Sequence, residues 1–284
     1  MRPQKIFAIT ILGLLGALIL LALTVPFWPS PVDTPEAFAN AMAMGDRFLE
    51  AKDFDAAVAT YTDAIRIRPG DSQAYCRRGA AYRDKGDFDK AIADFTEAIR
   101  IKPQDGIAYE MRGMAYEHKG DLDKAIADYS AAIGCQGRSA YYYYSFRGGA
   151  YRKKGEFEKA IADLTEAIQI RPGHARGYSA RALVFEKMGH LERALNDYTE
   201  AIRRDPTDFM AYSLRGKLNA RNGDLDQAID DYTQAIKLKP EEGILYWVRA
   251  HAYKKKNENA KAEDDYLQAK RLGVTSGAGD PAHP

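Results

Sequence analysis

The stretch that decides the fold is AYCRRGAAYRDKGDFDKAIADFTEAIRIKP, which runs from Ala74 to Pro103. A near copy, YYSFRGGAYRKKGEFEKAIADLTEAIQIRP, runs from Tyr143 to Pro172. From Phe38 onward the chain repeats itself every 34 residues, with one extra residue in the third unit. A period of this length indicates small units that stack on one another. Seven units fit, and they begin at Phe38, Ser72, Gly106, Tyr141, Ala175, Phe209 and Gly243.

Each unit predicts two helices joined by a tight turn. Aromatic residues recur at seven-residue spacing in the first half of a unit, as Tyr75 and Tyr82 do, and Ala91 and Phe95 mark the second half. A glycine and an aspartate between the halves favour a turn. A proline near the unit's end stops the second helix, as at Pro69, Pro103, Pro172, Pro206 and Pro240. Neither helix can bury its apolar stripe alone, so we expect an all-α stack.

These units resemble the tetratricopeptide repeat family. Its W-x2-L-G-x2-Y, A-x3-F and P signature is matched in the second unit by Tyr75, Arg78, Gly79, Tyr82, Ala91, Phe95 and Pro103. The resemblance covers residues 38–272. It implies a right-handed α-solenoid whose first helices line a concave groove, and a scaffold that binds a protein or peptide. It does not identify the partner.

Two charged positions depart from the family pattern. Units two to seven carry arginine where the family has leucine, at Arg78, Arg112, Arg147, Arg181, Arg215 and Arg249. Their second helices carry Asp94, Asp128, Asp163, Asp197, Asp231 and Asp265. Unit one has Met44 and Thr60 in these positions, so pairing with the preceding unit would leave Asp265 without a partner. We therefore predict six salt bridges within units, since partly buried charges need partners. The alternative is that the arginines form a ladder for a ligand.

The resemblance also implies that the ninth, twelfth and thirteenth residues of a unit face the groove. In the first three units these positions supply Asp46, Glu50, Asp84 and Glu117 against Arg83. In the last four they supply Arg152, Lys153, Lys187, Lys217, Arg221, Lys254 and Lys255 against Glu186. We expect the second half of the groove to attract an acidic segment, with Tyr142 and Trp247 as aromatic surface. The alternatives are a solvated surface polarised by chance and, for Tyr142, ordinary packing between units.

The stretch GCQGRSAYYYYSFRGG, from Gly134 to Gly149, contains the extra residue and interrupts the repeat. Its Cys135 has no histidine or acid nearby in the sequence to activate a thiol, so catalysis there is not expected. No histidine set, phosphate-binding loop or metal spacing occurs elsewhere, and we predict no enzyme activity, cofactor or metal. The formal net charge of +1 gives no reason to expect nucleic acid.

The N-terminus predicts a membrane anchor. Residues 6–25, IFAITILGLLGALILLALTV, are twenty uncharged residues, the length of a membrane-spanning helix. Arg2 and Lys5 precede them, which predicts a cytoplasmic N-terminus (1–5) and repeats outside the cytoplasm. A cleaved signal peptide is the alternative. A linker at 26–37 follows, and a disordered tail is expected at 273–284. Glu263 and Lys270 replace isoleucines of earlier units, so unit seven should end the stack.

Three functions remain open at this point. The first is a membrane-anchored scaffold that recruits a partner. The second is a structural subunit whose anchor helix packs in a larger membrane complex through Gly13 and Ala17, a small-residue pair. The third is a secreted adaptor whose mature chain begins near Asn40. Association with further copies or with other chains is compatible with each of them.

Overall fold

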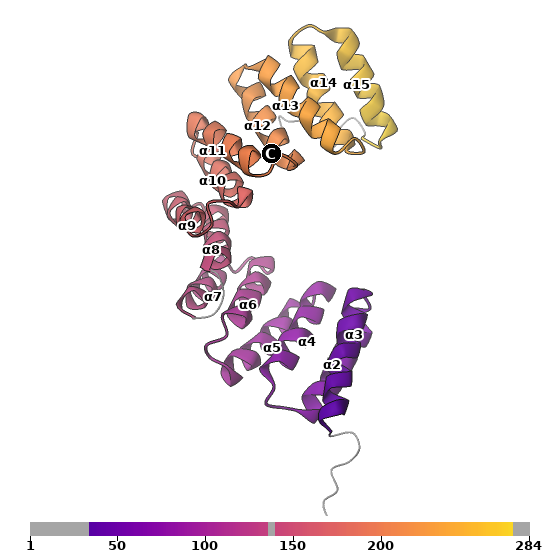
Figure 1. The fold of residues 1–284 in the computed structure, drawn as a ribbon, viewed down its shortest axis with the longest axis vertical. Coiled ribbons are helices and arrows are strands. Elements are labelled where there is room, and N and C mark those ends of the chain that lie inside the picture. Colours follow the sequence, from indigo (N-terminus) through magenta and orange to yellow (C-terminus); the bar gives the residue numbers. More distant parts are fainter. Residues whose placement is uncertain (1–33, 136–139, 275–284) are drawn as a thin grey trace, which may run out of the picture. The chain divides into compact units, whose positions relative to one another are not determined.

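The computed structural model of the chain describes residues 34–135 and 140–274, which form fourteen α-helices and no strand (Figure 1). The chain divides into two compact bodies, one ending at Ile101 and one beginning at Lys102. Units one and two lie in the first body, and units three to seven lie in the second. In every unit a first helix is followed by a second helix of similar length.

The first body contains two helix pairs. The first helix of unit one packs on its second helix, which packs in turn on the first helix of unit two. The two first helices also contact each other. The four helices are α2 (Pro35–Glu50), α3 (Phe54–Ile67), α4 (Ser72–Lys85) and α5 (Phe88–Ile101).

The second body continues the same arrangement through five units. Each first helix packs on the second helix of its own unit and, from unit four on, on that of the unit before. The first helices are α6 (Gly106–His118), α8 (Ala140–Lys154), α10 (Ala175–Lys187), α12 (Phe209–Asn222) and α14 (Gly243–Lys255). The second helices are α7 (Leu122–Gly134), α9 (Phe157–Ile170), α11 (Leu191–Arg204), α13 (Leu225–Leu238) and α15 (Asn259–Arg271). Five first helices begin at the first residue of their unit, α2 begins three residues earlier, and α8 begins one residue earlier.

The turn inside each unit has the same backbone conformation. Its fifteenth residue has a positive φ, between 77° and 95°, at Gly86, Gly120, Gly155, Gly189 and Gly223. Lys52 and Asn257 take the same position in the end units, with φ of 60° and 61°. Glycine suits this left-handed conformation because it has no Cβ atom. Asp53 and Asp121, which follow this position in units one and three, cap the second helix by accepting a hydrogen bond from the backbone amide three residues later.

A small residue in the first helix lets the two helices of a unit approach closely. Tyr129 of α7 is fully buried and lies against Gly113 of α6. A Cβ atom on Gly113 would lie 2.8 Å from the Tyr129 ring. Gly45 faces Tyr61 and Gly79 faces Phe95 in the same way. The aromatic residue and the glycine of the repeat pattern thus form one contact, and it fixes the first helix against the second.

The end of the stack is polar. Glu263 and Lys270 are exposed on α15, whereas Ile92 and Ile99, in the same positions of unit two, are partly buried. Within residues 34–135 and 140–274, no helix combines the length and the apolar character needed to cross a membrane. The predicted anchor at 6–25, the linker before residue 34 and the tail after residue 274 lie outside the described residues.

Candidate partner-binding face

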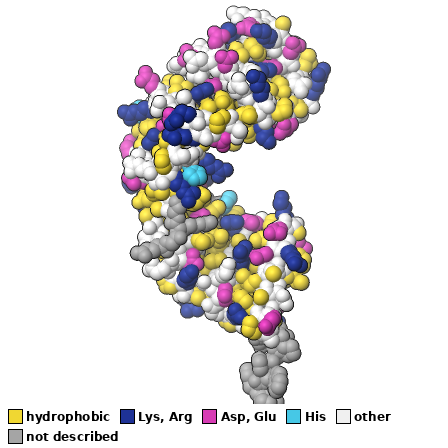
Figure 2. All heavy atoms as spheres, viewed as in Figure 1, with side chains coloured by type: hydrophobic (Ala, Val, Ile, Leu, Met, Phe, Trp, Pro, Cys, Tyr) yellow, Lys and Arg dark blue, Asp and Glu magenta, His cyan; other side chains and the backbone are white. Residues whose placement is uncertain are grey.

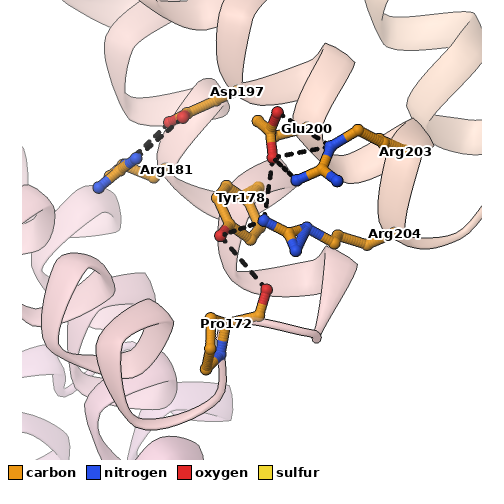
Figure 3. Close-up of polar contacts among 7 residues, drawn as sticks. All are labelled: Pro172, Tyr178, Arg181, Asp197, Glu200, Arg203 and Arg204. Carbon is orange, nitrogen blue, oxygen red and sulfur yellow. Dashed lines mark hydrogen bonds and ion pairs between the residues drawn. The ribbon is translucent and has the colours of Figure 1, made fainter.

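The arginines of units two to seven are held within their own units. In each unit the guanidinium donates two hydrogen bonds to one aspartate, with Nε to Oδ2 at 2.7–3.0 Å and Nη2 to Oδ1 at 2.7–2.9 Å. Figure 3 shows this pair in unit five, Arg181 and Asp197. Both partners are largely buried, and the hydrogen bond to Asp197 raises the pKa of Arg181 against the opposing effect of burial. A bidentate pair of this kind is strong and directional.

The same guanidinium also joins its unit to the preceding one. Arg181 Nη1 donates a 3.0 Å hydrogen bond to the hydroxyl of Thr165 in unit four. Four other arginines do the same, so that Arg78 bonds Thr62, Arg147 bonds Ser130, Arg215 bonds Thr199 and Arg249 bonds Thr233. Sequence reasoning missed this contact. The sequence does contain a signal for this contact. Units one to six carry threonine or serine at this position, whereas unit seven, which is the last repeat unit, carries Leu267.

These contacts argue against the alternative in which the row of arginines binds a ligand. Each guanidinium donates from its Nε and Nη2 to an aspartate, and Nη1 of Arg78, Arg147, Arg181, Arg215 and Arg249 donates to a hydroxyl of the neighbouring unit. The loop between units four and five is tied by a second network (Figure 3). There Tyr178 donates to the Pro172 carbonyl and accepts from Arg204, whose guanidinium also binds Glu200. Both networks hold units together.

The remaining exposed side of the first helices can be placed by helical geometry. Because an α-helix turns about 100° per residue, the second, ninth and thirteenth residues of a unit lie within about 40° of one another. The fifth and twelfth residues lie to one side of them, about 60° to 80° around the helix from the second residue. We call this side of α6, α8, α10, α12 and α14 the open face. Its exposed residues include Lys153, Lys187, Lys217, Arg221, Lys254 and Lys255, and Arg152 on it is half-buried.

Two of the predicted groove cations are already paired on the open face. Lys153 of α8 lies 2.7 Å from a carboxylate oxygen of Glu117 on α6, and Arg221 of α12 lies 2.6 Å from Glu186 on α10. The Tyr129 hydroxyl also donates to Glu117. Burial, together with the nearby Glu117 carboxylate, raises the pKa of Tyr129. Lys153 and Arg221 therefore neutralise acids of neighbouring first helices.

The other five groove cations form no hydrogen bond or ion pair with any residue in 34–135 or 140–274. They are Arg152, Lys187, Lys217, Lys254 and Lys255. The acids predicted for the first half are mostly paired, since Asp46 binds Arg77 and Asp84 binds Arg83. Figure 2 shows cationic and anionic side chains interspersed over the face in view. An uncompensated charge therefore remains on the basic half of the open face.

The two aromatic residues predicted for this surface differ in exposure. Tyr142 is 38% exposed, and its hydroxyl accepts a long hydrogen bond of 3.5 Å from Arg171. Trp247 is only partly exposed, because its ring lies 5.1 Å from the rings of both His251 and Tyr266. Tyr142 thus offers aromatic surface, while Trp247 mainly packs α14 against α15.

The chemistry available elsewhere is limited. Burial, with a contribution from Asp105, raises the pKa of the Cys135 thiol, which disfavours the nucleophilic thiolate. Within the part of the chain that the structure describes, no group of three or more His, Cys, Asp or Glu residues is placed to hold a metal ion. A cavity of about 150 Å³ on the open face, between α6 and α8, is lined by Met114, Glu117, His118, Phe146 and Lys153. It holds the ion pair already described.

Comparison with protein families identifies the repeat. Models of the tetratricopeptide repeat match residues 72–105, 107–134, 148–189, 179–242 and 221–276. No curated protein matches the chain.

Solved structures share the fold. A tetratricopeptide repeat protein from Parabacteroides merdae is 18% identical with a TM-score of 0.65, over 85% of this chain and 95% of its own. The MamA protein is 25% identical with a TM-score of 0.54, over 61% of this chain and 94% of its own. YrrB is 19% identical with a TM-score of 0.51, over 68% of this chain and 97% of its own.

Proposed function

This chain belongs to the tetratricopeptide repeat family, and we propose that it is a membrane-anchored scaffold that binds an acidic segment of a protein partner. Tetratricopeptide repeat proteins typically mediate contacts between proteins, and one with the same fold, YrrB, is described as having an unusual peptide-binding site. The binding surface is the open face of α8, α10, α12 and α14. The chain acts by recruitment and not by catalysis.

One observation carries this proposal, namely the five cations of the open face that have no ionic partner among the described residues. Like charges on neighbouring helices repel one another, so an unpaired row is a cost to the folded chain that a bound carboxylate removes. Such a row also raises the rate at which an acidic partner meets the face. Basic residues in a last helical turn are favoured by the helix dipole as well. The helix dipole does not explain Lys217, because this residue lies in the middle of α12.

The anchor is the second part of the proposal, and it rests on residues 6–25. An uncharged run of this length is long enough to cross a bilayer, and the positive residues before it favour a cytoplasmic N-terminus. The repeats then meet their partner outside the cytoplasm. The structural-subunit and secreted-adaptor functions differ from this proposal only in what the N-terminal segment does.

The test compares partners captured by the wild-type full chain and by a charge-reversed variant from gently solubilised membranes. The variant carries Arg152→Glu, Lys217→Glu, Lys254→Glu and Lys255→Glu. Arg221 is left unchanged because its reversal would place two carboxylates together beside Glu186. A control for surface charge carries Lys237→Glu and Lys270→Glu, which reverse two exposed cations on second helices. We expect a partner that both the wild type and the control retain and the reversed variant loses, and that weakens with salt.

The N-terminal part has its own readout. The intact mass of the captured chain should include residues 6–25 if they form an anchor, whereas a chain beginning near Asn40 would establish the secreted adaptor. Identical partners with the wild-type and reversed chains would refute binding through the open face. If Gly13→Leu and Ala17→Leu release the chain from a complex that charge reversal leaves intact, the structural-subunit function is correct.

A further inference from the structure

Consecutive units meet through the same three pairs of positions. The third, seventh and tenth residues of a first helix contact the twenty-eighth, twenty-fifth and twenty-first residues of the unit before. Between units one and two these pairs are Ala74 with Ile65, Arg78 with Thr62, and Ala81 with Val58. Between units six and seven they are Leu245 with Ile236, Arg249 with Thr233, and Ala252 with Ile229. The contact is a hydrogen bond between two apolar pairs.

The first and last units expose these positions instead of burying them. No unit precedes unit one in the repeat series, and its third, seventh and tenth residues are exposed on α2, whereas the third and tenth residues of every later unit are buried. No unit follows unit seven, and its three contact positions are exposed on α15. We call Asn40, Met44 and Arg47 the α2 end face. We call Glu263, Leu267 and Lys270 the α15 end face.

The two end faces are complementary at each pair of positions. If α2 of one copy takes the place on α15 of another copy that a following first helix would take, three new pairs form. They are Arg47 with Glu263, Met44 with Leu267, and Asn40 with Lys270. The first pair joins opposite charges, and neither Arg47 nor Glu263 forms an ion pair with any residue in 34–135 or 140–274. The second pair is apolar, and in the third the lysine can donate to the amide oxygen.

Solubility explains only part of this pattern. The terminal units of a repeat stack need a polar outer face, which accounts for the charged residues at both ends. It does not account for Met44 and Leu267, which are 52% and 48% exposed and are two of only seven large apolar side chains exposed in the described residues. Met44 replaces the arginine of the later units, and Leu267 replaces the threonine or serine of the earlier ones. Both sides of one polar contact have become apolar together.

We propose that a second copy of this chain binds end to end, with the α2 end face of one copy against the α15 end face of the next. A unit of the interior type would place buried apolar residues against Glu263 and Lys270, which leaves their charges without partners. Unit one offers Arg47 and Asn40 to them instead. The contact joins two different faces, so each copy keeps a free end and further copies add in series unless they close into a ring. The open face takes no part, and the proposal does not depend on the function proposed above.

The test measures the mass of the purified full-length chain in mild detergent by sedimentation velocity, corrected for bound detergent, at rising protein concentration. We expect the average mass to increase with concentration, as addition in series requires. Arg47→Glu places two glutamates opposite each other, and Glu263→Arg places two arginines opposite each other. Each variant alone should therefore associate at least about tenfold more weakly than the wild type. An equimolar mixture of the two should recover the association, because every contact between the two variants joins opposite charges.

Matched variants separate this contact from other causes of association. Lys237→Glu reverses an exposed cation of α13 and should have no effect. Met44→Gln should weaken association at least about threefold because it removes apolar surface from the contact, whereas Met210→Gln, at a residue 58% exposed on α12, should not change it. Recovery in the mixture also shows that both charge variants are folded.

Three results would overturn the end-to-end contact. The first is a mass that stays that of a single chain at every concentration. The second is association that Arg47→Glu and Glu263→Arg leave unchanged, which would assign it to residues 6–25 or to another surface. The third is loss of association that the mixture does not restore. The charge-reversed variant of the open face should self-associate normally while it loses its captured partner, so failure of this proposal and failure of the proposed function are distinguishable.

Discussion

The arginine–aspartate pair of unit five allows a sharp test of what holds the units together. Replacing Arg181 by methionine keeps most of the side-chain volume but removes the partner of Asp197. The Asp197 side chain is only 3% exposed, so water cannot replace the two lost hydrogen bonds. Breaking a buried pair by removing one partner costs about 3 to 5 kcal/mol. We expect about 3 kcal/mol here, because the Arg181 side chain is itself 20% exposed and its pairing is partly solvated.

Three companion variants separate the contributions. Arg181→Met with Asp197→Leu removes both charges, and we expect it to recover most of the loss, to within about 2 kcal/mol of the wild type. Thr165→Val removes only the hydrogen bond to the preceding unit and should cost about 1 kcal/mol. Arg193→Met is the matched control, since Arg193 is exposed and stacks on Phe185 without an ion pair to any described residue. It should change stability by about 0.5 kcal/mol or less.

The assay is urea unfolding followed by circular dichroism, with hydrogen exchange to locate the change. Stability in stacked repeats is a sum of unit and neighbour terms, so the loss should concentrate in amides of units four and five. Protection in unit two should be unchanged. If Arg181→Met costs no more than Arg193→Met, or if the double variant is as unstable as the single one, the pair does not hold the units together and the reasoning fails.

Two further predictions concern the turns and the buried tyrosines. Lys52→Gly and Asn257→Gly should each raise the free energy of unfolding by about 0.5 to 1 kcal/mol, because both residues now have a positive φ; a lower urea midpoint in either variant would contradict this. Burial raises the pKa of Tyr129, Tyr198 and Tyr232 in the folded chain, so their stabilising contribution is complete below the ordinary tyrosine pKa of about 10 and is lost as the pH rises above it. The urea midpoint should therefore decrease as the pH is raised from about 9 to about 11, and Tyr232→Phe should make this decrease smaller. If all tyrosines ionise near their ordinary pKa without loss of structure, the argument is wrong.

The repeat period alone predicts much of the fold. Five of the seven first helices begin at the residue where their unit begins, because the spacing of apolar residues and turn glycines encodes helix length locally. The within-unit arginine pairing was also deducible, since counting charges over all units left only one pairing without a remainder. That argument worked because the two residues recur together in every unit but the first.

The charge tally of the groove was less informative, for a physical reason. It counted Lys153 and Arg221 as available cations, whereas each neutralises a glutamate of a neighbouring first helix. Such a contact depends on the distance between two helices that are some 35 residues apart in the chain. No local pattern fixes that distance. The hydroxyl contact of the arginines escapes a count of opposite charges because a hydroxyl carries no charge.

Pairing, more than charge, separates the residues that hold the units together from those that we propose bind a partner. The arginines at the seventh position are committed to aspartates and, in most units, to hydroxyls, so a ligand could reach them only by breaking contacts that hold the units. Lys187, Lys217, Lys254 and Lys255 lie on the same helices but are exposed and have no such partner among the described residues. A bound carboxylate costs the fold nothing at these positions. Substitutions on the open face can therefore change which partner binds without altering the arginine–aspartate pairs that keep the units stacked.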